Sequence, residues 1–138
     1  MTTQQHDIRS FFERWAVSFD EMSDAYRDLL GPSATWVAGP PPIPVTHGGD
    51  QAVGLLEGFR NSHDLTTIDV DILHLGHSGD MVYSERVDHL VDSESRRFVS
   101  LPVAGVMRFD EHGQLTYWRD YWDMREFLEL PQRPSPIA

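Results

Sequence analysis

The hydrophobic pattern of the chain changes period near Thr66. Before that residue, apolar side chains recur every three or four positions, which is the period of one helix face. Three such stretches predict three helices, with apolar positions at Ile8, Phe11, Phe12, Trp15 and Phe19, then Met22, Tyr26, Leu29 and Leu30, then Val53, Leu56 and Phe59. We expect Asp20 to cap the second helix and Gly31-Pro32 to end it. Asp50 falls near the start of the third helix, which we expect to end near Ser62.

After Thr66 the period is two, which is typical of half-buried strands. Candidate strands run over Thr67 to Leu75, Met81 to Val91, Arg97 to Phe109 and Leu115 to Asp123, separated by polar hairpin turns. A short strand from Ala34 to Val37 precedes a stiff proline-rich loop over residues 39–44. Helices followed by a meander of long strands indicate an α+β domain, a curved sheet with about three helices on its concave side.

Length, charge and composition exclude several classes of protein. The 138 residues fit a single domain over 1–138, with residues 131–138 as an extended tail. The net charge of -11 and the absence of a Lys/Arg cluster argue against nucleic acid as a partner. With no cysteine, disulfides, thiol nucleophiles and cysteine-based zinc sites are excluded.

The remaining composition predicts where the protein works and what it does not bind. No signal peptide begins the chain and no eighteen apolar residues run together, so we expect a cytoplasmic protein without a membrane partner. His74 and His77 have metal-like spacing but no third ligand nearby, so no metal is expected.

Two predicted strands carry ionisable residues on their apolar faces. Arg86 and Asp88 lie two positions apart, so both point to one side of a strand. Asp120 shares its face with Trp118 and Trp122 in the same way. If these faces meet inside the curved sheet, they form either a buried structural ion network or proton-transfer machinery in an apolar cavity.

The segments 82–88 (VYSERVD), 101–106 (LPVAGV) and 118–127 (WRDYWDMREF) together resemble the limonene-1,2-epoxide hydrolase family. The similarity extends, more weakly, back through the third helix to Trp36. It implies the cone-shaped barrel shared with nuclear transport factor 2, SnoaL-type polyketide cyclases and ketosteroid isomerase, and a homodimer. It also implies a one-step, cofactor-independent mechanism in which Asp88 is the acid, Arg86 the bridging residue and Asp120 the base.

The chemistry of epoxide opening is consistent with these roles. The leaving oxygen needs a proton and the nucleophile needs a base. One guanidinium between two carboxylates leaves a net negative site, so we expect one carboxyl, that of Asp88, to stay protonated in an apolar cavity. The resemblance places the pocket walls and predicts a small apolar epoxide as substrate; these walls are Trp36, Phe59, Leu101, Val103, Trp118 and Phe127. His63 is expected at the cavity mouth.

The sequence departs from the family pattern at the nucleophile. In the family a Tyr and an Asn hold the attacking water, and the matching positions here are Trp36 and Ala38. An indole N–H donates but cannot accept a hydrogen bond, and an alanine side chain does neither. Thr46 and His47, at the end of a slightly longer loop, are candidate substitutes. Three functions therefore remain: an epoxide hydrolase, a cyclase or isomerase that uses a substrate hydroxyl, and a non-catalytic binder of small apolar ligands.

Overall fold

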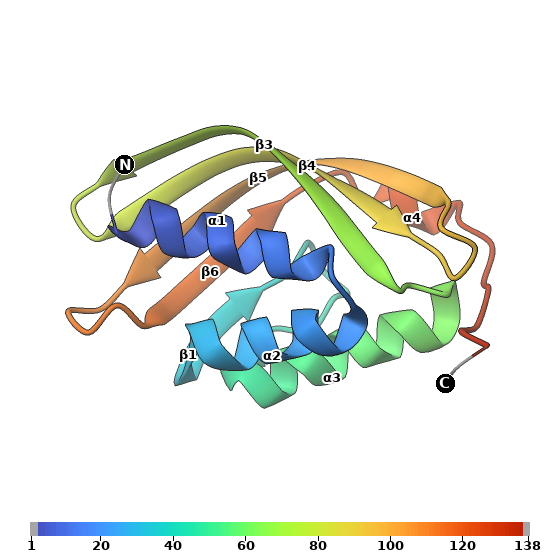
Figure 1. The fold of residues 1–138 in the computed structure, drawn as a ribbon, viewed down its shortest axis with the longest axis horizontal. Helices are drawn as coiled ribbons and strands as arrows, with labels where there is room; N and C mark the ends of the chain where they lie inside the picture. Colours follow the sequence, from blue (N-terminus) through green and yellow to red (C-terminus); the bar gives the residue numbers. More distant parts are fainter. Residues whose placement is uncertain (1–2, 137–138) are drawn as a thin grey trace.

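Six strands form one curved sheet, and helices cover its concave side in the computed structural model, which describes residues 3–136 (Figure 1). The helices are α1 (Thr3–Trp15), α2 (Phe19–Leu29), α3 (Gly48–His63) and the short α4 (Arg125–Leu128). The strands are β1 (Leu30–Val37), β2 (Thr46–His47), β3 (Thr67–Ser78), β4 (Met81–Val91), β5 (Arg97–Phe109) and β6 (Leu115–Tyr121). Their order in the sheet is β2-β1-β6-β5-β4-β3, and only β1 and β6 pair in parallel. The predicted α+β class and the helices on the concave side are confirmed.

The predicted boundaries of α2 were wrong at both ends. Ser18, and not Asp20, caps the helix, because the Ser18 hydroxyl accepts a hydrogen bond from the Glu21 N–H at 3.0 Å while Asp20 already lies in the first turn. At the other end the helix stops at Leu29, before the Gly31-Pro32 pair, and the backbone of Leu30 is extended. Two short elements, β2 and α4, were not predicted, because segments of two and four residues carry no readable period.

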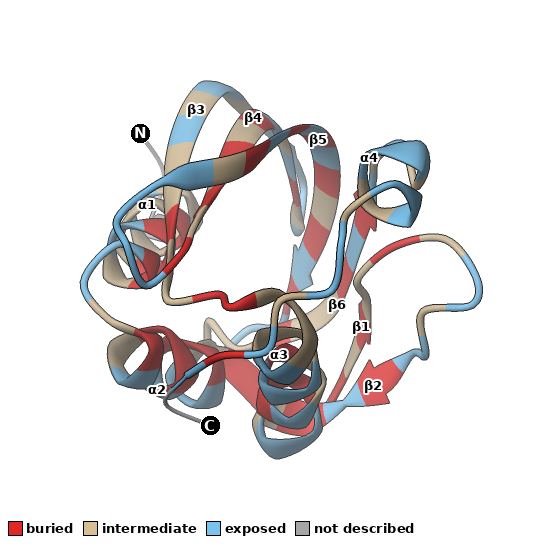
Figure 2. Ribbon diagram, turned by 90° about the vertical axis from the view of Figure 1, so that its right-hand side faces the viewer, coloured by how far each residue is buried: buried red, intermediate tan, exposed pale blue. Residues whose placement is uncertain are grey.

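Burial follows the alternation that the sequence predicts. Buried and exposed residues alternate along β5 (Figure 2). Five rings from both layers pack against one another in the core, with neighbouring centroids 4.9 to 6.1 Å apart: Phe11, Trp15, Tyr26, Trp36 and Trp118. Each such pair stabilises the fold by about 0.5–1.5 kcal/mol beyond its buried area. This aromatic cluster joins α1 and α2 to strands β1 and β6 of the sheet.

The C-terminal tail is docked on the domain. Residues 131–136 form no helix or strand, and the last two residues of the predicted tail lie outside the described part of the chain. The Arg133 N–H donates to the Ser62 carbonyl at 2.7 Å, and its guanidinium binds the enclosed Asp92 carboxylate at 3.1 Å. Burial raises the pKa of Asp92, but hydrogen bonds from the Arg96 N–H and from Arg133 outweigh burial and lower that pKa to about 2. The tail is therefore held beside the end of α3.

No helix within residues 3–136 combines the length and the apolar character that crossing a membrane requires.

Candidate active site

Arg86 binds two carboxylates at once on the concave side of the sheet. Its Nε and Nη2 donate to Asp88 at 2.8 and 3.1 Å, and its Nη1 and Nη2 donate to Asp120 at 3.0 and 2.8 Å. All three residues are buried, with 1%, 6% and 6% of their surface exposed. Arg86 and Asp88 come from β4 and Asp120 from β6, so the structure brings together the three residues that the sequence predicted. Glu85 and Arg119 point to the opposite, exposed face, as expected.

The ion cluster spans β5, which lies between β4 and β6. Gly105 of β5 pairs with Ser84 on one side and with Asp120 on the other. A Cβ atom at Gly105 would lie 2.7 Å from Asp120 Oδ1 and 2.9 Å from Arg86 Nη1. The absence of a side chain therefore lets the Arg86 guanidinium pass beneath β5 and reach the second carboxylate. Glycine inside an alternating strand often marks such a close approach, and this signal was present in the sequence.

The two carboxyl groups differ in their surroundings. Within residues 3–136, Asp88 accepts hydrogen bonds only from Arg86, whereas Asp120 also accepts one from the Trp118 indole N–H at 2.8 Å. Burial raises the pKa of Asp88, the Arg86 guanidinium lowers it and the charge of Asp120 raises it again, so that the pKa of Asp88 lies above its usual value. Burial opposes the charge of Arg86, but the carboxylates of Asp120 and Asp88 outweigh burial and raise the pKa of Arg86. The ring of Phe12 lies 4.7 Å from the guanidinium carbon and covers this cation.

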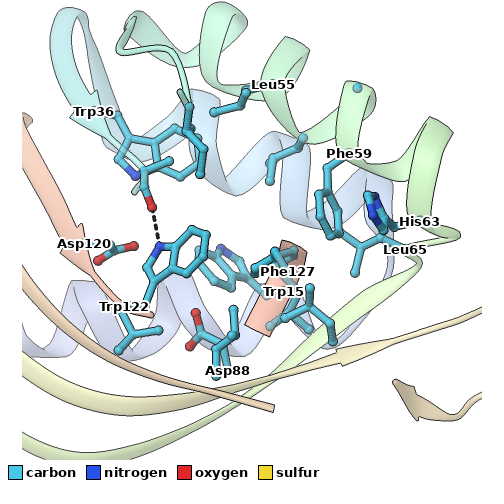
Figure 3. A pocket seen from close by; sticks show the side chains of 18 of the residues that line it. Trp15, Trp36, Leu55, Phe59, His63, Leu65, Asp88, Asp120, Trp122 and Phe127 are labelled. Carbon is cyan, nitrogen blue, oxygen red and sulfur yellow. Dashed lines mark hydrogen bonds between the residues drawn. The ribbon is translucent and has the colours of Figure 1, made fainter. Parts of the chain in front are cut away.

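An apolar cavity of about 470 Å³ opens onto the ion cluster. Asp88 and Asp120 lie on one side of it, across from Phe59 and His63 (Figure 3). Five of the predicted wall residues line the cavity: Trp36, Phe59, Leu101, Val103 and Phe127. His63 stacks on Phe59 with ring centroids 4.5 Å apart, and burial lowers its pKa, which favours the neutral imidazole. The cavity thus combines an almost wholly apolar wall with one charged patch.

Three expectations about the cavity were wrong. Trp118 does not line it; this residue is fully buried in the aromatic cluster beneath, where it stacks on Trp36 at 4.9 Å. Thr46 and His47 do not return to the cavity either, because they form β2 and pair with β1. His47 is exposed and its Nδ1 lies 3.3 Å from the Thr35 hydroxyl. Neither residue replaces the polar groups that are missing at Trp36 and Ala38.

Several lining residues were not predicted as part of the site. Trp15 from α1 and Tyr26 from α2 reach the cavity from the helical layer. The Trp122 indole N–H donates to the Ala38 carbonyl at 2.7 Å, which ties the end of β6 to the proline-rich loop (Figure 3). In the sequence, Trp15 and Tyr26 occupy ordinary apolar helix positions, so nothing distinguished them from other core residues. Among residues 3–136, no three His, Asp or Glu side chains are arranged to hold a metal ion.

We predict that Gly105→Ala lowers the free energy of unfolding by about 1–3 kcal/mol, the usual cost of overpacking a filled core. The atoms that the new methyl group meets end long side chains, but their mutual ion pairs prevent them from moving aside. Chemical denaturation checks this, with Gly76→Ala as the control, because a Cβ at Gly76 of β3 meets nothing within 4 Å. Equal stability of the two variants would show that the ion cluster does not need the glycine.

Comparisons with family models and with solved structures point to the same family. The family model for the limonene-1,2-epoxide hydrolase catalytic domain matches residues 6–133. A similar solved structure is that of an LEH-like epoxide hydrolase from M. tuberculosis, where LEH denotes limonene-1,2-epoxide hydrolase. The two structures have a TM-score of 0.67 and 25% sequence identity, and the match covers 90% of this chain and 85% of that chain.

Two further structures resemble the fold at lower identity. A nuclear transport factor 2-like protein of unknown function from Burkholderia pseudomallei has a TM-score of 0.75 and 17% identity, with 94% of this chain and 98% of that chain covered. A SnoaL-like protein from Jannaschia sp. CCS1 has a TM-score of 0.70 and 14% identity, with 91% and 88% covered. Since the family model spans nearly all of the residues described above, the chain belongs to the limonene-1,2-epoxide hydrolase family.

Proposed function

We propose that this protein adds water to a small apolar epoxide in one step, with Asp88 as the general acid and Asp120 as the general base. The observation that carries the proposal is the Arg86 guanidinium, which holds both carboxyl groups at the wall of one apolar cavity. An acid and a base that face the same space supply both proton transfers of epoxide opening. The M. tuberculosis relative, an LEH-like epoxide hydrolase, supports the same reaction class.

The difference between the two carboxyl groups supports these roles. Asp88 has fewer donors and a raised pKa, so it keeps the proton that the epoxide oxygen needs. Asp120 accepts three hydrogen bonds, and in this proposal it takes a proton from the water. The water oxygen bonds to one ring carbon as the carbon–oxygen bond of the epoxide breaks. The product is a diol, and the proton then returns from Asp120 to Asp88 through solvent.

The walls of the cavity favour a compact hydrocarbon body next to the epoxide. Phe59 and Phe127 meet edge to face at 5.0 Å, and Leu101 and Val103 of β5 lie close to the ion cluster in the same wall. The volume of about 470 Å³ is in the range of small-molecule sites. No group beyond the acid, the base and water enters this reaction, so the proposed activity is independent of a cofactor.

A ring-closing reaction on the same residues is the second candidate function. It is favoured by the lack of a side-chain acceptor at Trp36 and Ala38: the Trp36 indole N–H can only donate, and alanine has no polar side chain. If a hydroxyl of the substrate replaces water, Asp88 and Asp120 perform the same proton transfers and the product is a cyclic ether. A third candidate, a non-catalytic binder of apolar ligands, gives no role to two buried carboxyl groups on the cavity wall.

We predict that, with enzyme in excess over a cyclic apolar epoxide in oxygen-18 water, the diol of the first turnover contains one labelled oxygen. Direct attack by water requires this result, whereas attack by a carboxylate would leave the first diol unlabelled. Asp120→Asn should lower the rate by about 10²- to 10⁴-fold, the usual contribution of a general base. Asp123→Asn, an exposed aspartate three residues further on, should keep the wild-type rate.

Product analysis separates the three candidate functions. Formation of an unlabelled cyclic ether would show that the protein catalyses ring closure and not hydrolysis. Tight binding of apolar epoxides without any turnover would leave non-catalytic ligand binding as the function.

We also propose that the protein is a homodimer that joins through the outer face of the sheet. Tyr83 and Tyr121 are 45% and 52% exposed there, and Pro102 and Ala104 of β5 are exposed between their strands. These residues form an apolar patch beside the charged Glu85 and Arg119 on the same face, and we propose this patch as the centre of the interface.

We predict that sedimentation at micromolar concentration gives the mass of two 15.8 kDa chains. Ala104→Arg should give the mass of one chain, because it places a charge at the centre of the patch. Val17→Arg, which changes a 69% exposed residue between α1 and α2, should leave the dimer intact. A wild-type protein that sediments as a monomer would contradict the proposal.

A further inference from the structure

Asp120 by itself does not orient a water molecule. A water that donates one hydrogen bond to a carboxylate still rotates about that bond, and loss of alignment costs rate. A second polar contact is needed to point a lone pair at the epoxide carbon. Neither the Trp36 nor the Ala38 side chain supplies an acceptor, because Trp36 has only an N–H group and alanine has no polar atom; the Ala38 carbonyl already accepts one hydrogen bond, from Trp122.

The two oxygens of Asp120 differ in how many donors they already have. Oδ1 accepts from both Arg86 Nη1 and the Trp118 indole N–H, at 3.0 and 2.8 Å. Oδ2 accepts from Arg86 Nη2 alone, at 2.8 Å. A carboxylate oxygen accepts two hydrogen bonds readily, so Oδ2 is the atom with capacity for the nucleophile.

Tyr26 reaches the same cavity from the helical layer. It lines the cavity, is 1% exposed, and its hydroxyl makes no hydrogen bond within the described part of the chain. Its ring is fixed among four others, including Trp15 at 5.5 Å, Trp36 at 5.0 Å and Trp118 at 5.6 Å. A buried hydroxyl without a partner loses free energy unless water or a ligand satisfies it. Such a group on a rigid ring is therefore a preorganised contact for a bound molecule.

The charges of the ion cluster reach this hydroxyl. Burial raises the pKa of Tyr26 well above its usual value, and the negative charge of Asp120 raises it further. The phenol therefore stays protonated and can both donate and accept a hydrogen bond. Since Tyr26 and Asp120 share a cavity but no direct hydrogen bond, a small molecule such as water is suited to bridge them.

We propose that the Tyr26 hydroxyl and Asp120 Oδ2 together hold the water that attacks the epoxide, so that α2 supplies the positioning group that β1 lacks. This inference rests on the proposed function. The water donates one hydrogen bond to Oδ2 and one to the Tyr26 oxygen, which directs a lone pair at the ring carbon. As the new carbon–oxygen bond forms, the proton moves to Asp120 and the ring oxygen takes the proton of Asp88. Tyr26 neither gains nor loses a proton.

The Tyr26→Phe variant tests this assignment, with Tyr117→Phe of β6 as the control, because Tyr117 does not line the cavity. Two substrates are compared: an apolar epoxide that only water can open, and an epoxide with a hydroxyl placed to close a ring. In Tyr26→Phe, kcat for hydrolysis should fall by roughly 10- to 100-fold with little change in KM, since one aligning contact is lost. With the second substrate, the ratio of cyclic ether to diol should rise by a similar factor. The hydroxyl of that substrate is aligned by its covalent link to the epoxide and does not need Tyr26. The unfolding midpoint should not fall, since the lost hydroxyl has no protein partner.

The outcomes distinguish this inference from the proposed function. Hydrolysis at the wild-type rate in Tyr26→Phe, or an equal loss of diol and ether with an unchanged ratio, would overturn the role of Tyr26 while Asp88 and Asp120 keep theirs. An Asp120→Asn variant that retains activity, or a wild-type protein that opens no epoxide, would overturn the proposed function and the role of Tyr26 with it.

Discussion

The double ion pair of Arg86 is the interaction on which the rest of the structure depends. It joins β4 to β6 beneath β5 and so links three adjacent strands on the concave side of the sheet. A Cβ atom at position 105 would crowd this ion pair, so the glycine there gives it room. The ring of Phe12 covers the guanidinium. Removing the guanidinium would leave two buried carboxyl groups without a counterion, a change that typically costs about 3–5 kcal/mol. Placing these charges on the wall of a cavity is difficult to explain by stability alone.

The same ion cluster gives the cavity its chemical asymmetry. One positive charge cannot neutralise two negative ones, and water is too scarce in the apolar interior to compensate. Keeping a proton on Asp88 removes the excess charge, while the Trp118 indole N–H adds a third donor to Asp120. In the proposed reaction, a proton donor and a proton acceptor therefore lie on either side of one guanidinium before any substrate enters. Preorganisation of this kind is the main contribution that a protein makes to acid–base catalysis.

The sequence predicted the parts of the fold and site that depend on local periodicity. Period-two alternation is enough to place Arg86, Asp88 and Asp120 on the inner face of the sheet. It does not say how deep an inward side chain lies, so it could not correct the family resemblance, which implied that Trp118 lines the cavity wall; Trp118 lies beneath that wall. Depth is decided by the helices packed on the sheet, as the position of Tyr26 on α2 also shows. The Ser18 cap was missed because Ser18 and Asp20, two residues of the preferred capping types, stand two positions apart at the start of the helix, and their residue types do not select between them.

The protonation state of Asp88 is the central claim, since the cluster's charge balance and the proposed chemistry both depend on it. Carbon-13 NMR of the side-chain carboxyl of Asp88, recorded across pH, measures it directly. The structure predicts that Asp88 remains protonated above the usual aspartate value of about 3.9. Because an acid must carry its proton to act, activity should be lost as the pH rises through the midpoint so measured. Titration of Asp88 at or below the usual value would contradict the account.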